Sequence, residues 1–155
     1  MANQTQLAIL QQGVDAWNVW RQQNPDEYID LRRAELGGID LHGANFREAN
    51  LSGADLYEAD LHGADFTGAN LRSIMLLHTN LSGALMTDID LGGGDLTGAN
   101  LSGANLSGVD LTGIYMSGAD FTGANLRGAS IYLDDFQGKT GVDLTPADLT
   151  DVNII

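Results

Sequence analysis

Residues 49–73 read ANLSG ADLYE ADLHG ADFTG ANLRS, five units of five residues that share one pattern. The pattern extends far beyond this stretch, because an apolar residue stands at every fifth position from Leu31 to Phe136, twenty-two times without a gap. All four phenylalanines of the chain occupy this register. A period of five matches neither the 3.6 residues of a helix nor the two residues of a flat sheet, so the repeat predicts a different winding.

Each unit has an inside and an outside. The residue two places before the apolar centre is Ala in thirteen units, and residues two apart in an extended chain point to the same face. The residue between them is Asp or Asn in seventeen units and must point outward. Gly stands two places after the centre in fifteen units, which suits a corner of the chain. We therefore expect a coil whose short sides stack as parallel ladders about 4.8 Å apart.

Residues that stack on one another should share a character, and a turn of twenty residues with four sides gives this result. Phe46, Phe66 and Met86 then form one column, and the small inward residue of that side is alanine in every turn. Bulkier inward residues gather on other sides of the coil. Bulk in one layer is thus offset by a small residue in another, as close packing requires.

Units such as ADLHG, ADFTG, ANLRS and ANLSG resemble the pentapeptide-repeat family over about two thirds of the chain. The resemblance implies an all-β solenoid, the right-handed quadrilateral β-helix with four pentapeptides per coil. It implies less about role. Many single-domain members are similar cyanobacterial proteins without known activity, one branch regulates cell differentiation through protein contacts, and another mimics DNA to bind gyrase. Biochemical function therefore does not follow from the fold.

The ends of the coil differ from its middle in composition, as expected for caps that cover exposed backbone and apolar side chains. Residues 1–25 are predicted to hold one α-helical cap that begins at Thr5 and runs to about Gln23. Trp17 and Trp20, the only tryptophans, should cover the first turn. A dimer-forming helix is the alternative interpretation of the same apolar stripe.

The repeat coil itself is assigned to residues 26–138, and its register slips after the last centre, Phe136. Apolar positions resume at Leu144, eight residues on, so an insertion has entered the coil. Residues 139–155 are therefore predicted to form a C-terminal cap or irregular repeats. Thr145-Pro146 also resembles the opening of a short helix, and the two interpretations stay open.

Composition and net charge limit the classes of partner and the cellular location that we expect. The formal net charge is −14, from 21 Asp and Glu against 7 Lys and Arg, which argues against direct binding of nucleic acid or anionic membrane and favours a basic protein partner. There is no cysteine, no apolar run of the roughly 20 residues of a membrane span, and no basic start of a secretory signal. We expect a cytoplasmic protein. Its terminal Ile154-Ile155 can seal the last turn or pair with a second copy, so monomer and homodimer both remain possible.

No catalytic, cofactor or metal site is expected. Asp and Ser recur as outward repeat positions and do not converge. His42 and His62 occupy one outward position a turn apart, beside Asp40 and Asp60, and two ligands about 4.8 Å apart could share a metal ion. Other polar residues continue that column, namely Ser82, Ser102 and Thr122. The column therefore indicates a position that tolerates any polar residue.

Departures from the pattern mark a candidate protein-binding surface. Apolar residues replace outward polar ones at Tyr57, Met75, Leu77 and Tyr115, all on one side of the twenty-residue turn, and at Leu85 elsewhere. We call the first four residues the apolar strip. The apolar strip is interpreted either as a packing site for the C-terminal segment or as a partner site.

Two functions from different classes remain. The first is a non-enzymatic protein-interaction scaffold of unknown partner that presents a rigid acidic surface. The alternative is a DNA mimic that binds and inhibits gyrase or another DNA-binding protein, suggested by the net charge and by the column that contains Asp40, Asp60 and Asp120. Asn80 and Asn100 in the same column weaken that alternative, because only part of the column is charged.

Overall fold

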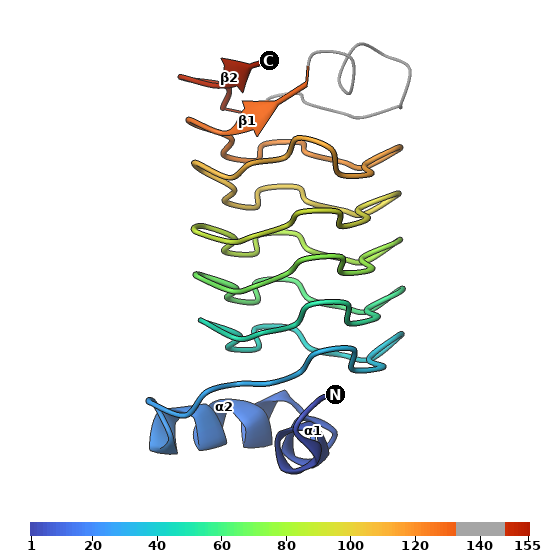
Figure 1. The fold of residues 1–155 in the computed structure, drawn as a ribbon, viewed down its shortest axis with the longest axis vertical. Coiled ribbons are helices and arrows are strands. Elements are labelled where there is room, and N and C mark those ends of the chain that lie inside the picture. Colours follow the sequence, from blue (N-terminus) through green and yellow to red (C-terminus); the bar gives the residue numbers. More distant parts are fainter. Residues whose placement is uncertain (133–147) are drawn as a thin grey trace.

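The structure is a computed structural model that describes residues 1–132 and 148–155. Two helices, α1 (Gln4–Leu10) and α2 (Val14–Gln23), lie at one end, and the repeats form a stack of coils above them (Figure 1). Two short strands, β1 (Ser130–Ile131) and β2 (Asn153–Ile154), pair in parallel at the other end. No described helix is long and apolar enough to cross a membrane.

Parallel β-bridges join residues twenty positions apart along the repeats. One coil has four such bridging positions, and they belong to the pairs Asp30–Asn50, Glu35–Asp55, Asp40–Asp60 and Asn45–Asp65. The predicted turn of twenty residues with four sides is therefore confirmed. The predicted column is confirmed as well, because the rings of Phe46 and Phe66 stack with their centroids 5.3 Å apart.

Backbone hydrogen bonds explain why the inward residues flank the bridging one. Leu36 N donates to Asp55 O at 2.8 Å, and Asp55 N donates to Ala34 O at 2.9 Å. Leu36 and Ala34 are both buried, so this side of the coil contributes a small and a large apolar side chain to the core. Thr79 takes the small position on one side, and its hydroxyl donates to Leu56 O at 2.9 Å, which satisfies a buried polar group.

The outward Asp and Asn residues also have a structural role that the repeat pattern did not reveal. Their side-chain oxygens accept a hydrogen bond from the backbone N–H two residues on, as in Ser52 N to Asn50 Oδ1 at 3.0 Å and Tyr57 N to Asp55 Oδ1 at 3.0 Å. Only a short side chain with a carbonyl or carboxylate oxygen closes this Asx turn. Asp and Asn are therefore selected by the corner, whatever their charge.

Most corners place a residue in the left-handed region, where glycine has no steric penalty. Gly98 has φ 67°, and a Cβ there would lie 2.5 Å from His78 Nδ1, so any other residue at this corner would have to displace the His78 ring. Seven corners among the described residues carry another residue at positive φ, namely Arg33, Glu48, Glu58, Ser73, His78, Asp88 and Asp151. Each of these corners bears a conformational cost that a glycine would avoid.

The prediction of one N-terminal helix from Thr5 to Gln23 is wrong. Asn3 is the N-cap of α1, and its side chain accepts hydrogen bonds from Thr5 N and Gln6 N. Gly13 then adopts φ 107° between the two helices, a conformation that ends the first helix and redirects the chain.

Side chains of both helices take the place of the missing coil below the first one. Gln6 of α1 accepts from Asp30 N and donates to Tyr28 O. On another side, Asn18 of α2 accepts from Asn45 N at 2.9 Å. These polar side chains form hydrogen bonds with backbone N–H and C=O groups that would otherwise be unpaired at the edge of the stack.

The tryptophans cover the apolar end of the same coil. Trp17 is fully buried, its Nε1 donates to Asn45 O at 2.9 Å, and its ring lies 5.9 Å from that of Phe46. Trp20 stacks on Trp17 with the ring centroids 5.4 Å apart. The prediction that Trp17 covers the first turn is confirmed.

The insertion near the C-terminus is confirmed by the spacing of the last bridges. Asn125 bridges Asp148, 148 − 125 = 23 residues on, three more than in the regular coils, and Ser130 pairs with Asn153 at the same offset. Asp148 therefore resumes the repeat register. The predictions that concern Phe136, Leu144, Thr145-Pro146 and the boundary between 138 and 139 lie outside the described residues.

Leu101→Asp tests the stacked core. The Leu101 side chain is fully buried, and an unpaired charge there costs several kcal/mol against a total stability of about 5–15 kcal/mol. We expect this variant to lose the cooperative thermal transition measured by circular dichroism. Asn100→Asp is the matched surface control, because aspartate keeps the acceptor that holds Ser102 N and loses only the 3.4 Å contact between Asn100 Nδ2 and Asn80 Oδ1. A cooperative transition of Leu101→Asp at the wild-type temperature would contradict the core.

Candidate interaction surfaces

The apolar strip lies on one side of the coil, in adjoining outward positions. Met75 bridges Asp55 and Asp95, and Asp95 bridges Tyr115, so Met75 and Tyr115 share one column with an aspartate between them. Their exposed fractions are 41% and 69%. The strip is therefore discontinuous, because the coil that contains Asp95 carries a charged residue at this position.

Tyr57 and Leu77 occupy the neighbouring outward column in successive coils. Glu58 N donates to Leu77 O at 3.0 Å, which sets these two coils side by side. Tyr57 is 44% exposed and meets the His78 ring edge-on at 6.1 Å, whereas Leu77 is half-buried. Three of the four predicted residues are thus clearly open to solvent, and their role in binding stays a prediction.

The two histidines of the predicted column are in contact. The rings of His42 and His62 stack with centroids 5.3 Å apart and planes 9° from parallel. His42 Nδ1 lies 2.6 Å from Asp40 Oδ1, and His62 Nδ1 lies 3.4 Å from Asp60 Oδ1. Within residues 1–132 and 148–155, no group of three or more His, Cys, Asp or Glu residues could hold a metal ion.

The asparagines of this column make contacts that a row of acids could not. Asn80 Nδ2 donates to Asp60 Oδ1 at 3.0 Å, and Asn100 Nδ2 lies 3.4 Å from Asn80 Oδ1. An amide can donate and accept at once, so it links one coil to the next along the surface. A carboxylate in its place would repel the aspartate of the preceding coil.

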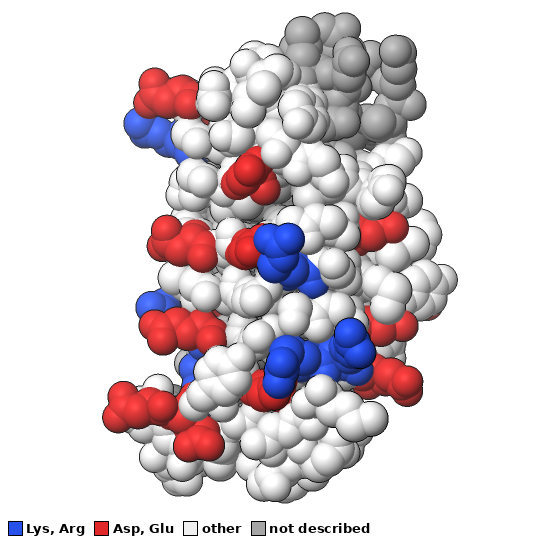
Figure 2. Space-filling view, in the orientation of Figure 1, with Lys and Arg blue, Asp and Glu red and all other residues white. Residues whose placement is uncertain are grey.

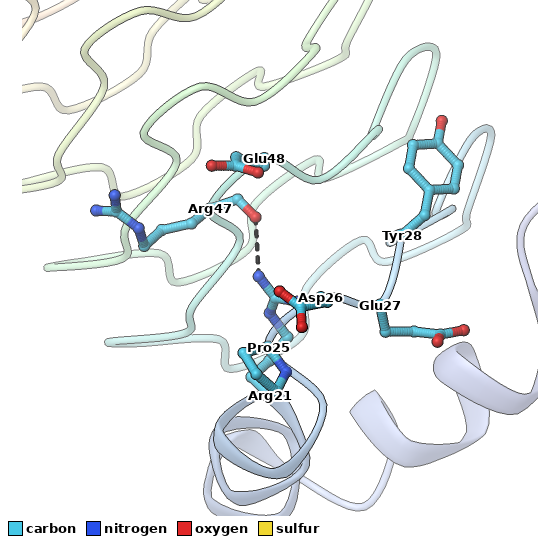
Figure 3. Close-up of a pocket in the computed structure, with 7 residues that line it drawn as sticks. All are labelled: Arg21, Pro25, Asp26, Glu27, Tyr28, Arg47 and Glu48. Carbon is cyan, nitrogen blue, oxygen red and sulfur yellow. Dashed lines mark hydrogen bonds between the residues drawn. The ribbon is translucent and has the colours of Figure 1, made fainter.

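A pocket of about 280 Å³ opens where α2 meets the first coil (Figure 3). Its lining residues are Arg21, Pro25, Asp26, Glu27, Tyr28, Arg47 and Glu48. Arg21 reaches from α2 to the carbonyl of Arg47, where Nη2 donates at 2.9 Å. Burial lowers the pKa of Arg21, and Glu48 opposes that effect.

Arg21 caps the edge of the first coil and is poorly placed to bind a ligand. It is only 8% exposed, and its Nε and Nη1 are buried with no hydrogen-bond partner among the described residues. A molecule in the pocket could not reach these two nitrogens without a movement of the protein. Sequence reasoning missed this arginine because a charged residue on a helix is usually solvated.

Charge is unevenly distributed on the surface. Figure 2 shows acidic side chains along both edges of one face, with several basic side chains between them on the coils nearest the helices. A protein with net charge −14 therefore still presents a local basic area.

Asp40 and His42 should form a pH-dependent pair. The hydrogen bond between them raises the pKa of His42 above its ordinary 6.5 and lowers the pKa of Asp40 below its ordinary 3.8. The histidine contribution to stability is present below its unfolded pKa and is lost as the pH rises through the folded pKa. The aspartate contribution is present above its unfolded pKa and is lost as the pH falls through the folded one.

An NMR titration of the His42 ring measures this effect. We expect a pKa above 6.5 in the wild-type protein, which returns towards 6.5 in Asp40→Asn. Asp120→Asn, in the same column but away from the histidine pair, is the control and should leave the titration unchanged. A raised pKa that survives Asp40→Asn would show that the hydrogen bond is not its cause.

Comparison with known proteins identifies the repeats. The sequence model of the family described as pentapeptide repeats matches eight copies, over residues 34–73, 64–103, 76–113 and 99–132. These matches cover more than half of the chain. No curated protein matches at a significant level.

Solved structures of similar proteins were also found. A pentapeptide repeat protein, Rfr23 from the cyanobacterium Cyanothece 51142, is 27% identical with TM-score 0.49, and the alignment covers 89% of this chain and 93% of that one. HetL, involved in heterocyst differentiation regulation in Nostoc sp. strain PCC 7120, is 24% identical with TM-score 0.46, over 79% and 77%. QnrB1, a plasmid-mediated fluoroquinolone resistance protein, is 22% identical with TM-score 0.34, over 81% and 77%. On the strength of the repeat match, the chain belongs to the pentapeptide-repeat family.

Proposed function

We propose that this protein is a non-enzymatic interaction scaffold whose coil, the right-handed quadrilateral β-helix of its family, presents the apolar strip to a protein partner. The observation that carries the proposal is the exposure of Tyr57, Met75 and Tyr115 together on one side of the coil, whereas the exposed Leu85 stands alone on another side. Large apolar side chains at such positions cost solubility and are typical of contact surfaces.

The bridged coils suit this role because they hold the strip in place. Leu56 N donates to Met75 O and Met75 N donates to Ala54 O, so the backbone under the strip is paired to the coil below. A surface that is already ordered loses little conformational entropy on binding.

The surroundings of the strip indicate the chemistry of the partner. Asp55 and Asp95 bridge Met75 from the two neighbouring coils, and Glu58 follows Tyr57 directly in the chain. A partner with an apolar centre and a rim of Lys and Arg would complement this surface. The aspartates that could serve as acids or bases instead hold backbone N–H groups, as Asp55 holds Tyr57 N, which supports a binding role over a catalytic one.

Affinity capture from the source cell tests the strip. Immobilised wild-type protein should retain a partner that the Tyr57→Ser/Leu77→Ser variant loses by about tenfold, because the central apolar contacts are removed. Leu85→Ser is the matched control, since Leu85 is 43% exposed but belongs to another side. Identical partner sets for all three proteins would count against the strip.

DNA mimicry remains the second candidate, favoured by the net charge of −14 and by the bridged pair of Asp40 and Asp60. We expect salt-sensitive inhibition in a gyrase supercoiling assay at two salt concentrations, weakened by Asp40→Asn/Asp60→Asn. No inhibition at micromolar protein would remove this candidate.

A further inference from the structure

One surface pocket combines basic and hydroxyl side chains without any acid. It has a volume of about 300 Å³, and its lining residues are Arg33, Ser52, Gly53, Asn70, Arg72 and Ser73. We call it the arginine pocket. Three other pockets lined by described residues each contain at least one carboxylate. The chain has 21 Asp and Glu residues, so a pocket with none of them in its lining differs from these three in its expected ligand.

Arg33 is a cation without an internal partner. Its side chain is exposed, and within residues 1–132 and 148–155 it makes no side-chain hydrogen bond or ion pair. It stands at a corner with φ 57°, and a Cβ at Gly53 would lie 3.4 Å from Arg33 Cγ, so the side chain passes over that glycine. The fork of five N–H donors on its guanidinium therefore stays available to a ligand.

Arg72 is held in place by an aspartate of the next coil. Its Nη1 lies 3.3 Å from Asp90 Oδ1 and 3.1 Å from Asp90 Oδ2. This ion pair uses one nitrogen of the guanidinium and leaves Nε and Nη2 for other contacts. Asp90 thus orients the arginine without lining the arginine pocket itself.

The remaining polar groups of the pocket are donors or can act as donors. Asn70 Oδ1 accepts from Arg72 N at 3.1 Å, which turns the oxygen to the backbone and leaves Nδ2 without a hydrogen bond in the part of the chain described here. The hydroxyls of Ser52 and Ser73 likewise make no hydrogen bond there. A site with two guanidinium groups, one amide N–H₂ and two hydroxyls fits a ligand that only accepts hydrogen bonds.

We propose that the arginine pocket binds the phosphate group of a phosphate ion or phosphate monoester. A phosphate carries about two negative charges at neutral pH and three or more acceptor oxygens, and arginine forks match its geometry. The donors come from successive coils and line one pocket, so they can contact different oxygens of the same phosphate group. The proposal is independent of the function proposed above, because none of the strip residues lines this pocket.

Net charge does not prevent this binding. At physiological ionic strength charges farther than about 8 Å are largely screened, so the distant acids have little effect inside the pocket. Asp90 is paired with Arg72 at 3.1 Å and offsets part of its charge, so Arg33 supplies the unpaired positive charge of the pocket. Added chloride should weaken the complex, since it screens the arginines as well.

NMR titration of the ¹⁵N-labelled protein with inorganic phosphate at pH 7.5 and constant ionic strength tests the proposal. We expect saturable shifts of the Gly53 and Ser73 amides. Arg33→Gln should weaken binding about tenfold, the size of one lost charged contact. Arg32→Gln is the matched control, because Arg32 is paired with Asp30 and does not line the pocket, and it should bind as the wild type does.

The source of the phosphate is distinguished by a second titration with a phosphoserine peptide and its unphosphorylated form. Tighter binding of the phosphopeptide than of phosphate, with no binding of the unphosphorylated peptide, supports a phosphorylated partner. Equal affinities support a free phosphate ligand. Linear shifts that sodium chloride reproduces, or equal affinities of Arg33→Gln and Arg32→Gln, would overturn the proposal.

Discussion

Backbone hydrogen bonds between residues about twenty apart hold each coil to the next, and every surface of this protein depends on them. Because they place equivalent residues above one another, a substitution at one outward position meets the same position of the neighbouring coil. His42 stacks on His62 for this reason, as Phe46 stacks on Phe66 inside. The same register brings Arg33 and Arg72, from different coils, to the rim of one pocket. Residues that share one surface of such a protein therefore belong to columns that cross successive coils, because residues adjacent in the chain point to different sides.

The acidity of the chain has a structural origin in part. Asp and Asn both close the turn at the following corner, as Asp55 does for Tyr57 N and Asn50 for Ser52 N. Since either residue closes the turn, contacts on the surface can determine which of the two is present. Asn80, for example, links its coil to the preceding one through its hydrogen bond to Asp60. A high count of aspartates is therefore a weak sign of DNA mimicry in this family, because the fold itself needs an oxygen at that position.

The coil could be predicted from the sequence because its pattern is local and repeats many times. The period of twenty, the phenylalanine column and the insertion before Asp148 follow from counting residues, and the lid formed by Trp17 follows from the apolar stripe of the N-terminal segment. The break between the helices was missed, although Gly13 is visible in the sequence, because an isolated glycine is tolerated in many helices. The burial of Arg21 and the arginine pocket could not be predicted either. Both depend on where long side chains lie across the backbone of another coil, which no spacing rule specifies.

The constant twenty-residue offset also has a consequence for how the chain folds. Each regular coil pairs residues that are the same number of positions apart in the sequence. The loop-closure entropy lost when a further coil is added therefore does not grow as the stack lengthens. The helices precede the coils in the chain, and Gln6 and Asn18 already offer hydrogen-bonding partners to the first of them. Assembly can therefore proceed in the order of synthesis, with each finished turn acting as the template for the next while the ribosome is still at work.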